Sequence, residues 1–253
     1  MLPFLKNHPF AVEAFFEASI VLTFAVPKKD VEHLIPECLT LDTYNNEWAF
    51  VAIAMVQTKQ LRPKGFPTFM GNHFFLIGYR IFVQYINEKG KRLRGLYILK
   101  SETDKKKMQV LGNIFTHYNY TTTDITVLHR DHFTEINSKR SGLQIKMHAT
   151  IGQKTLPEHS PFKDWLTARK FVGPLPFTFT YNQHKKEVLI IEGVRQNWTP
   201  QPVKVCSYNI SFLHKEAFKN AVLANAFIIH NIPYYWKKGK VELWKKEENS
   251  RVF

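Results

Sequence analysis

Cysteine is scarce in this sequence. The chain of 253 residues holds only Cys38 and Cys206, and neither belongs to a Cys-x-x-Cys pair. Two cysteines so far apart exclude a disulfide framework and a thiolate metal site. A reducing compartment is the simpler interpretation, so we expect a cytoplasmic protein.

Long apolar runs are lacking as well. No stretch approaches the about 18 uninterrupted apolar residues that a membrane-spanning helix needs. The apolar N-terminal segment is interrupted by His8, Glu13 and Glu17, which excludes the apolar centre of a signal peptide. We therefore expect no association with a membrane.

The sequence also lacks the common nucleotide and metal motifs. It has no glycine-rich phosphate loop, no G-x-G-x-x-G, no G-x-S-x-G and no H-E-x-x-H. His129 and His132 lie three residues apart in a segment predicted to be extended, where such a pair points to opposite faces. We expect neither a metal ion nor another cofactor.

The composition is that of a folded globular protein. It is 44% hydrophobic, 14% aromatic and 22% charged, and we expect a single domain over residues 1–253. The formal net charge is +14, which attracts anions of any kind, from nucleic acid to a carboxylate. Charge alone identifies no partner.

Strands are predicted to outnumber helices. Runs rich in β-branched and aromatic residues predict strands at 19–26, 47–58, 73–86, 93–100, 142–151, 176–181, 187–196 and 203–213. Turns are predicted at 87–90 and 182–186, and helices at about 104–118, 161–171, 30–35 and 214–230. This order predicts an α+β fold with a mostly antiparallel, strongly curved or closed sheet and a few flanking helices.

Charged residues interrupt the apolar faces of three predicted strands. Arg80, Lys100 and Glu192 each share a strand face with apolar side chains two residues away. Burying an unpaired charge costs several kcal/mol, so each group must reach the rim, form a structural ion pair or line a polar cavity. Arg80 and Glu192 are a possible pair. Arg195, on the other face of its strand from Glu192, is a further candidate.

The C-terminal segment mixes basic and aromatic residues. Lysines surround Trp236 and Trp244, as in platforms that bind single-stranded nucleic acid. Glutamates are interleaved with these lysines, which favours a solvated tail. Nucleic-acid binding through the basic surface therefore stays an alternative function, and we expect nucleic acid not to be the partner.

The order of several motifs resembles a known superfamily. The run VPKKDVEHLIPECLTLDTYNNEWAFVAIAMVQ resembles the N-terminal part of acetoacetate decarboxylase. HFFLIGYRIFV, LRGLYILKSETDKKKMQVLGNIFTHYNY, DWLTARKFVGPLPFTF and IIEGVRQNWTPQPVKV look more like an uncharacterised bacterial branch of that superfamily. Together the motifs extend over roughly residues 18–213. The resemblance implies a curved, cone-like β-barrel with flanking helices around a central cavity.

The resemblance also implies a candidate chemistry. Acetoacetate decarboxylase acts through a lysine Schiff base, and its amine is made nucleophilic by burial and a neighbouring cation. In the matching region this chain has Lys105, Lys106 and Lys107 at the start of a predicted helix. Where the family carries a pocket glutamate and a substrate-facing arginine, this chain has Val51 and Glu17.

From these observations we predict a barrel whose central cavity binds a small carboxylate or carbonyl compound. Arg80 would hold the anion, Glu192 would orient Arg80, Lys100 would add positive charge, and Trp198 would form part of the wall. The alternative is a lyase that acts on a keto acid through a Schiff base, with Lys100, Lys105 or Lys106 as the amine. A homodimer formed by edge pairing is also possible.

Overall fold

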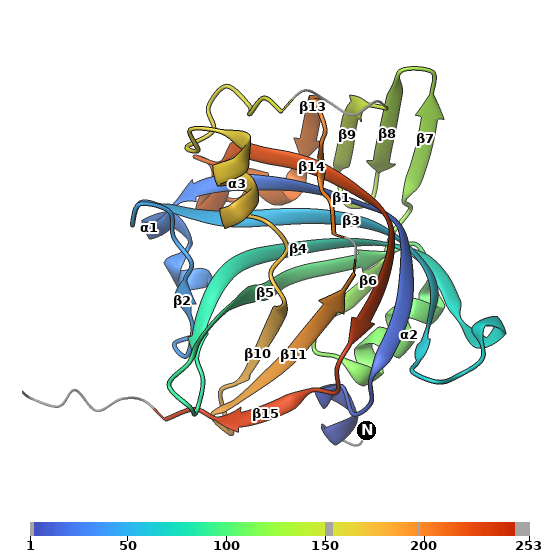
Figure 1. The fold of residues 1–253 in the computed structure, drawn as a ribbon, viewed down its shortest axis with the longest axis vertical. Helices are drawn as coiled ribbons and strands as arrows, with labels where there is room; N and C mark the ends of the chain where they lie inside the picture. Colours follow the sequence, from blue (N-terminus) through green and yellow to red (C-terminus); the bar gives the residue numbers. More distant parts are fainter. Residues whose placement is uncertain (1–2, 150–153, 197, 246–253) are drawn as a thin grey trace, which may run out of the picture.

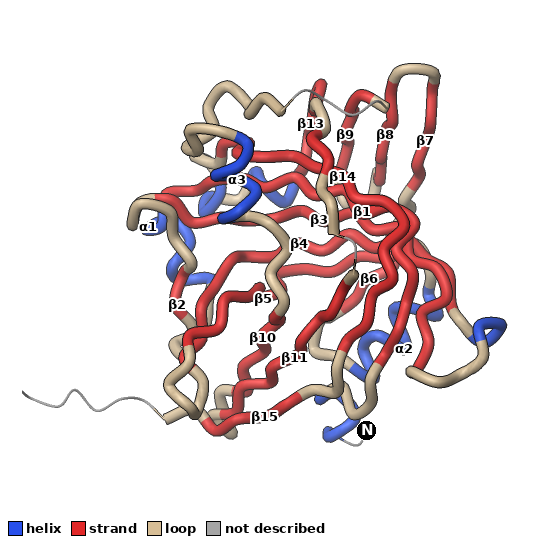
Figure 2. Tube along the Cα trace, viewed as in Figure 1, coloured by secondary structure: helices blue, strands red, loops and turns tan. Residues whose placement is uncertain are grey.

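The computed structural model describes residues 3–149, 154–196 and 198–245, and its architecture is dominated by β-strands (Figures 1 and 2). The main sheet contains β1 (Val12–Pro27), β2 (Thr40–Leu41), β3 (Trp48–Pro63), β4 (Asn72–Ile86), β5 (Arg92–Thr103), β6 (Tyr120–Thr122), β10 (Phe177–Asn182), β11 (Glu187–Arg195), β12 (Gln201–Pro202), β14 (Val222–Trp236) and β15 (Lys240–Leu243). A four-stranded sheet contains β7 (Thr126–Arg130), β8 (Phe133–Ser138), β9 (Leu143–His148) and β13 (Val205–Ile210). The α-helices are α1 (Lys28–Val31), α2 (Lys106–Phe115) and α3 (Trp165–Phe171).

The main sheet closes into a ring. Its strands follow the order β14, β1, β3, β4, β5, β10 and β11, and β11 then pairs with β14 again. The pairs that close the ring are Gly193 with Trp236, Val194 with Tyr235 and Arg195 with Tyr234. The predicted strand-rich α+β fold with a strongly curved or closed sheet is confirmed.

Both faces of the long central strands are buried. On β3, Ile53 and Met55 pack into the larger hydrophobic core, which also contains Ile145 and Met147 from the four-stranded sheet. The alternate residues of the same strand, Ala52, Ala54 and Val56, belong to a second core together with α3. The apolar character of this segment on both faces follows from this position between two packed layers.

Most predicted turns and helices are present. Asn87 to Gly90 form the β4–β5 turn, where Gly90 has a φ of +71° and the Asn87 side chain accepts hydrogen bonds from the backbone amides of Lys89 and Lys91. The helix predicted at 104–118 is α2. The helix predicted at 161–171 begins later, at Trp165, because the Asp164 side chain accepts a hydrogen bond from the amide of Thr167 and caps the first turn.

The helix predicted at 214–230 is wrong. Short 3-10 turns occupy Ser211–His214 and Glu216–Phe218, and β14 begins at Val222. Strand β14 pairs with β1 over most of its length, from Val222 opposite Ala25 to Trp236 opposite Val12. The hydrogen bonds and packing of this pairing outweigh the local helical propensity of an alanine-containing segment.

The C-terminal segment is not a solvated tail as far as residue 245. Residues Lys240–Leu243 form β15, which pairs with β11, and the Glu242 side chain is buried where it accepts hydrogen bonds from Tyr85 and Lys240. Lys237 is paired with Glu192. Lys238 and Lys245 are exposed, and Lys246 lies outside the described residues. Within the described parts of the chain, no helix is long and apolar enough to cross a membrane.

Candidate functional site

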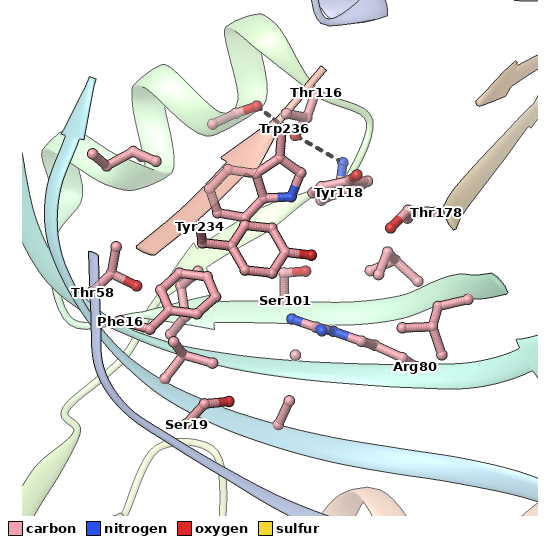
Figure 3. A pocket seen from close by; sticks show the side chains of 18 of the residues that line it. Phe16, Ser19, Thr58, Arg80, Ser101, Thr116, Tyr118, Thr178, Tyr234 and Trp236 are labelled. Carbon is pink, nitrogen blue, oxygen red and sulfur yellow. Dashed lines mark hydrogen bonds between the residues drawn. The ribbon is translucent and has the colours of Figure 1, made fainter. Parts of the chain in front are cut away.

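The ring of strands encloses a cavity of about 560 Å³. Strands β1, β3, β4, β5, β10, β11 and β14 contribute to its wall, together with α2 and the segment 172–175. Most of the wall is apolar or aromatic. Its polar side chains include Ser19, Arg80, Ser101, Tyr118, Thr178 and Tyr234 (Figure 3).

Arg80 extends from β4 into this cavity. On the neighbouring strand it lies opposite Ala52, and Ala54 lies opposite Gly78, so small residues surround its base. The guanidinium folds back over Gly78, where an added Cβ would come within 2.8 Å of Arg80 Nε. That Nε is buried and has no hydrogen-bond partner among the described residues, and none of their carboxylates forms an ion pair with Arg80.

Two tyrosines of the cavity wall, Tyr118 and Tyr120, lie within the electrostatic influence of Arg80. Burial raises the pKa of Tyr118, while Thr178 and the positive charge of Arg80 act in the opposite direction. Burial likewise raises the pKa of Tyr120 to about 12, although the positive charge of Arg80 acts to lower it. Both phenols therefore stay protonated at neutral pH and are neutral hydrogen-bond groups beside a cation.

A second guanidinium lies at the end of β11. Arg195 stacks on Trp198, with 4.6 Å from its Cζ to the ring centroid, and donates a hydrogen bond to the carbonyl oxygen of Pro174. Burial lowers the pKa of Arg195, and the Tyr234 phenol opposes this change. Tyr234 itself stacks on Phe16 with 4.6 Å between ring centroids, and in Figure 3 its hydroxyl points toward the space that Arg80 and Ser101 face.

Several buried polar atoms of the wall have no partner within the described chain. Besides Arg80 Nε, these are Trp198 Nε1, His8 Nε2 and Thr58 Oγ1. Burial lowers the pKa of His8 to about 4, so this imidazole is neutral at neutral pH. Buried polar atoms in native proteins almost always have a partner, which in a cavity is water or a ligand.

The charged groups of the wall are all basic. Among the described residues that line the cavity there is no aspartate, glutamate or lysine. Arg62, at the end of β3, is neutralised by Glu13 at 2.7 Å, whereas Arg80 and Arg195 have no carboxylate partner among the described residues. The cavity therefore combines an apolar wall with a net positive charge.

The structure places two of the predicted site residues in the cavity wall, Arg80 and Trp198. Glu192 does not line the cavity, and its carboxylate lies 2.9 Å from Lys237 Nζ, so the predicted pairing with Arg80 is not formed. Arg195, on the opposite face of the same strand, reaches the cavity instead.

Lys100 also lies outside the cavity. Its Nζ is 2.8 Å from Glu102 Oε1 on the opposite face of the sheet, and the Tyr79 hydroxyl donates to the other oxygen of Glu102. The cause is a β-bulge in β5: Tyr79 pairs with Lys100 while Arg80 pairs with Ile98, which leaves Leu99 as the extra residue. The bulge shifts by one residue the alternation of β5 side chains between the two faces of the sheet. Ser101 therefore lines the cavity in place of Lys100.

The residues singled out by the resemblance lie elsewhere. Lys105 is exposed and 3.3 Å from Asp104, and Lys106 is exposed at the start of α2. Val51 is fully buried in the larger core, and Glu17 pairs with Lys59 at 2.5 Å. None of the four lines the cavity.

Sequence reasoning missed the aromatic and small residues of the site. Alternation along a predicted strand could not identify three of its tyrosines, Tyr118, Tyr120 and Tyr234. The first two lie outside the predicted strands, and Tyr234 follows a segment predicted as a helix. Gly78 carried a usable signal, since an isolated glycine inside a strand often marks a close approach of another group. Among the described residues, no group of three or more histidine, cysteine, aspartate or glutamate side chains is placed to hold a metal ion.

The fold is similar to solved structures of the acetoacetate decarboxylase type. Acetoacetate decarboxylase from Legionella pneumophila superposes with a TM-score of 0.62 at 12% identity, over 92% of this chain and 88% of that one. An acetoacetate decarboxylase-like enzyme from Sphingomonas wittichii gives 0.58 at 11% identity, over 96% and 95%. The enduracididine biosynthesis enzyme MppR, solved with the condensation product of pyruvate and imidazole 4-carboxaldehyde, gives 0.57 at 7% identity, over 92% and 89%.

Identities this low show only that the fold is shared. The family is shown instead by a family model that matches the sequence. No functionally curated protein matches the chain. The model of one family, DUF2071, described as an uncharacterized conserved protein, matches residues 14–231, which is most of the chain. The chain thus belongs to the DUF2071 family and has an acetoacetate decarboxylase-like fold.

Proposed function

We propose that the cavity binds a small organic acid and that the guanidinium of Arg80 holds its carboxylate. The observation that carries this proposal is a half-buried cation without a counter-ion: Arg80 Nε is buried without a partner, and no acidic side chain of the described residues lines the cavity. An arginine cannot lose its proton to escape the cost of burial. A bound anion would supply the missing partner.

The shape of the guanidinium suits a carboxylate. Its planar fork of donors matches two carboxylate oxygens, which is a stronger and more directional contact than an ammonium ion provides. Gly78 leaves room for the group to lie flat against the strand. This geometry supports a bidentate contact between Arg80 and the ligand.

Neutral donors nearby suit a second oxygen on the ligand. Ser101 and the phenol of Tyr234 face the same space as Arg80 (Figure 3), and Tyr118 also lines the cavity. Protonated hydroxyls can donate to a carbonyl or hydroxyl oxygen next to the carboxylate. MppR has also been solved with pyruvate bound, and this supports a 2-oxo acid as one ligand class for the present cavity.

Calorimetric titration with a panel of carboxylic and 2-oxo acids tests the proposal. Arg80→Ala should weaken binding of every acid by about 10- to 100-fold, because a charge-assisted pair of hydrogen bonds is lost. Arg92→Ala is the matched control, since Arg92 is exposed at the start of β5 and does not line the cavity. Equal affinities for wild type and Arg80→Ala would remove Arg80 from the site.

The Schiff-base alternative has no amine in the described wall of the cavity. Lys100 is held by Glu102, and Lys105 and Lys106 are exposed. Borohydride reduction in the presence of pyruvate or acetoacetate, followed by mass spectrometry, should therefore leave every lysine unmodified. A reduced adduct on a single lysine would favour the lyase over a binding protein.

A further inference from the structure

The cavity is large for the smallest acids. Its volume of about 560 Å³ falls within the range of pockets that enclose drug-sized ligands, roughly 300–1,000 Å³. A three-carbon acid such as pyruvate would occupy a small part of this space and leave apolar wall in contact with water. The size of the cavity therefore needs an explanation beyond the anion site at Arg80.

The wall beyond Arg80 is a continuous apolar track. Along β4, Gly78, Leu76 and Phe74 precede Arg80 on the same strand face and line the cavity, to which Ile77 and Asn72 also contribute atoms. Their partners on β3 are Ala54, Val56 and Thr58, which also line the cavity. The guanidinium lies over Gly78, and from Gly78 to Phe74 the strand advances four residues, which is about 13 Å at the usual rise of about 3.3 Å per residue.

The far end of this track is apolar too. Helix α2 contributes Met108, Leu111 and Phe115 to the wall, and β1 and β14 contribute Phe16 and Trp236. The titratable groups toward that end are held without net charge: burial keeps His8 neutral, and Arg62 is paired with Glu13. A sugar or nucleotide body would find few free hydrogen-bond partners along this wall: Ser19, Thr58 and His8 offer polar atoms. The Thr116 hydroxyl already donates to Gly112, and the Asn72 amide donates to Leu61.

We infer that the ligand is an amphiphilic acid, with its carboxylate at Arg80 and an extended alkyl or aryl body along the β3–β4 track toward α2. This inference rests on the proposed function and adds the class of the ligand. Burial of apolar ligand surface against this wall supplies affinity that a short acid cannot reach.

A chain-length series measures the contribution of the track. Straight-chain acids from acetate to decanoate are titrated into the full-length protein below their micelle concentrations. Phenylpyruvate is compared with pyruvate to measure the effect of an aryl group. We expect each added methylene to tighten binding by about threefold to fourfold until the track is filled. Arg80→Ala should weaken every member of the series by a similar factor.

Val56→Phe shortens the track without touching the anion site. Val56 lies opposite Leu76, four residues along β3 from the partner of Arg80, and its side chain lines the cavity. The variant should weaken octanoate at least tenfold and leave acetate and pyruvate unchanged. Val110→Phe is the matched control, because Val110 is 58% exposed on α2 and does not line the cavity. Thermal unfolding of each variant checks that it is folded.

The outcomes separate the inference from the proposed function. Affinity that rises with chain length, depends on Arg80 and falls in Val56→Phe supports the inference. Short acids that bind through Arg80 with no gain from a longer chain would overturn the inference and leave the proposed function standing. Long acids that bind equally to wild type, Arg80→Ala and Val56→Phe would indicate adsorption to the surface and overturn both.

Discussion

Two basic side chains on adjacent strands differ in how the protein neutralises them. Lys100 is on the face that packs into the larger core, where Glu102 and Tyr79 form a network around it. Arg80 is on the cavity face, where the described residues offer phenols and hydroxyls but no carboxylate. The first cation is part of the packed structure, and the second is available to a ligand.

This difference shows why a buried charge alone does not identify a site. Glu102 is only 4% exposed, so its pairing with Lys100 completes a structural network that needs nothing from outside. Arg80 instead faces a space large enough to admit an anion. The informative feature is a charge whose partner is missing on the side of a cavity.

The largest expected effect compares the same substitution on the two faces. Lys100→Met should lower the free energy of unfolding by about 3 kcal/mol, the lower end for a buried pair, because it leaves the buried Glu102 without its cation while Lys100 itself is 34% exposed. Arg80→Met should leave it unchanged or raise it by up to about 2 kcal/mol, since a half-buried charge without a counter-ion is removed. Urea denaturation measures both, and equal losses would contradict the distinction between the two cations.

The neutral histidine of the cavity provides a pH test. Burial lowers the pKa of His8 from 6.5 to about 4, so the unfolded chain takes up a proton at a higher pH than the folded one. Stability from this group is complete above pH 6.5 and is lost as pH falls toward 4, by up to about 3 kcal/mol.

His8→Asn isolates this contribution, because asparagine tolerates the φ of 52° at this position. The difference in unfolding free energy between wild type and variant should change across that pH window. A difference that is constant with pH would mean that the pKa of His8 is the same in the folded and the unfolded chain.

The stabilisation by a bound acid should also distinguish Arg80 from Lys100. An acid present at about 100 times its Kd stabilises a folded protein by about 2.7 kcal/mol. We expect wild type and Lys100→Met to gain this stabilisation and Arg80→Met to lose most of it, as measured by the shift of Tm with ligand. A full shift in Arg80→Met would place the anion site elsewhere.

The smallest expected effect concerns the glycine under Arg80. Gly78→Ala adds a Cβ that would come within 3.0 Å of both Nε and Nη2 of Arg80 and so displaces the guanidinium. We expect acid binding to weaken about tenfold, or about 1.4 kcal/mol, with little change in Tm, because the displaced group is the far end of a flexible side chain. Calorimetry and thermal unfolding together measure the two quantities.

Much of the architecture is readable from local patterns. Segments 47–58 and 73–86 are apolar on both faces, which predicts their burial between two layers, and the Asn-to-Gly segment at 87–90 predicts the hairpin that joins β4 and β5. Arg80 was a candidate for the same reason, as a charged residue in alternation with Phe74, Leu76 and Phe82. The family resemblance added the central cavity.

Two errors have physical causes that local patterns do not reveal. Segment 214–230 fits a helical period, and only its pairing with β1 makes β14 a strand. Lys100 alternates correctly with Leu96 and Ile98 in the sequence, and only the bulge at Leu99 turns it to the opposite face.

Local patterns in the sequence specify a strand-rich fold, the strands with two buried faces, and the presence of charges that need partners. Which face of each strand encloses the cavity was decided by tertiary structure, because ring closure between β11 and β14 selects Arg195 over Glu192. Tertiary structure also decided which cation has a partner, since Glu102 can reach Lys100 and no described carboxylate reaches Arg80. Alternation along a strand is a local property, whereas the neutralisation of a buried charge depends on residues that only the folded chain brings together.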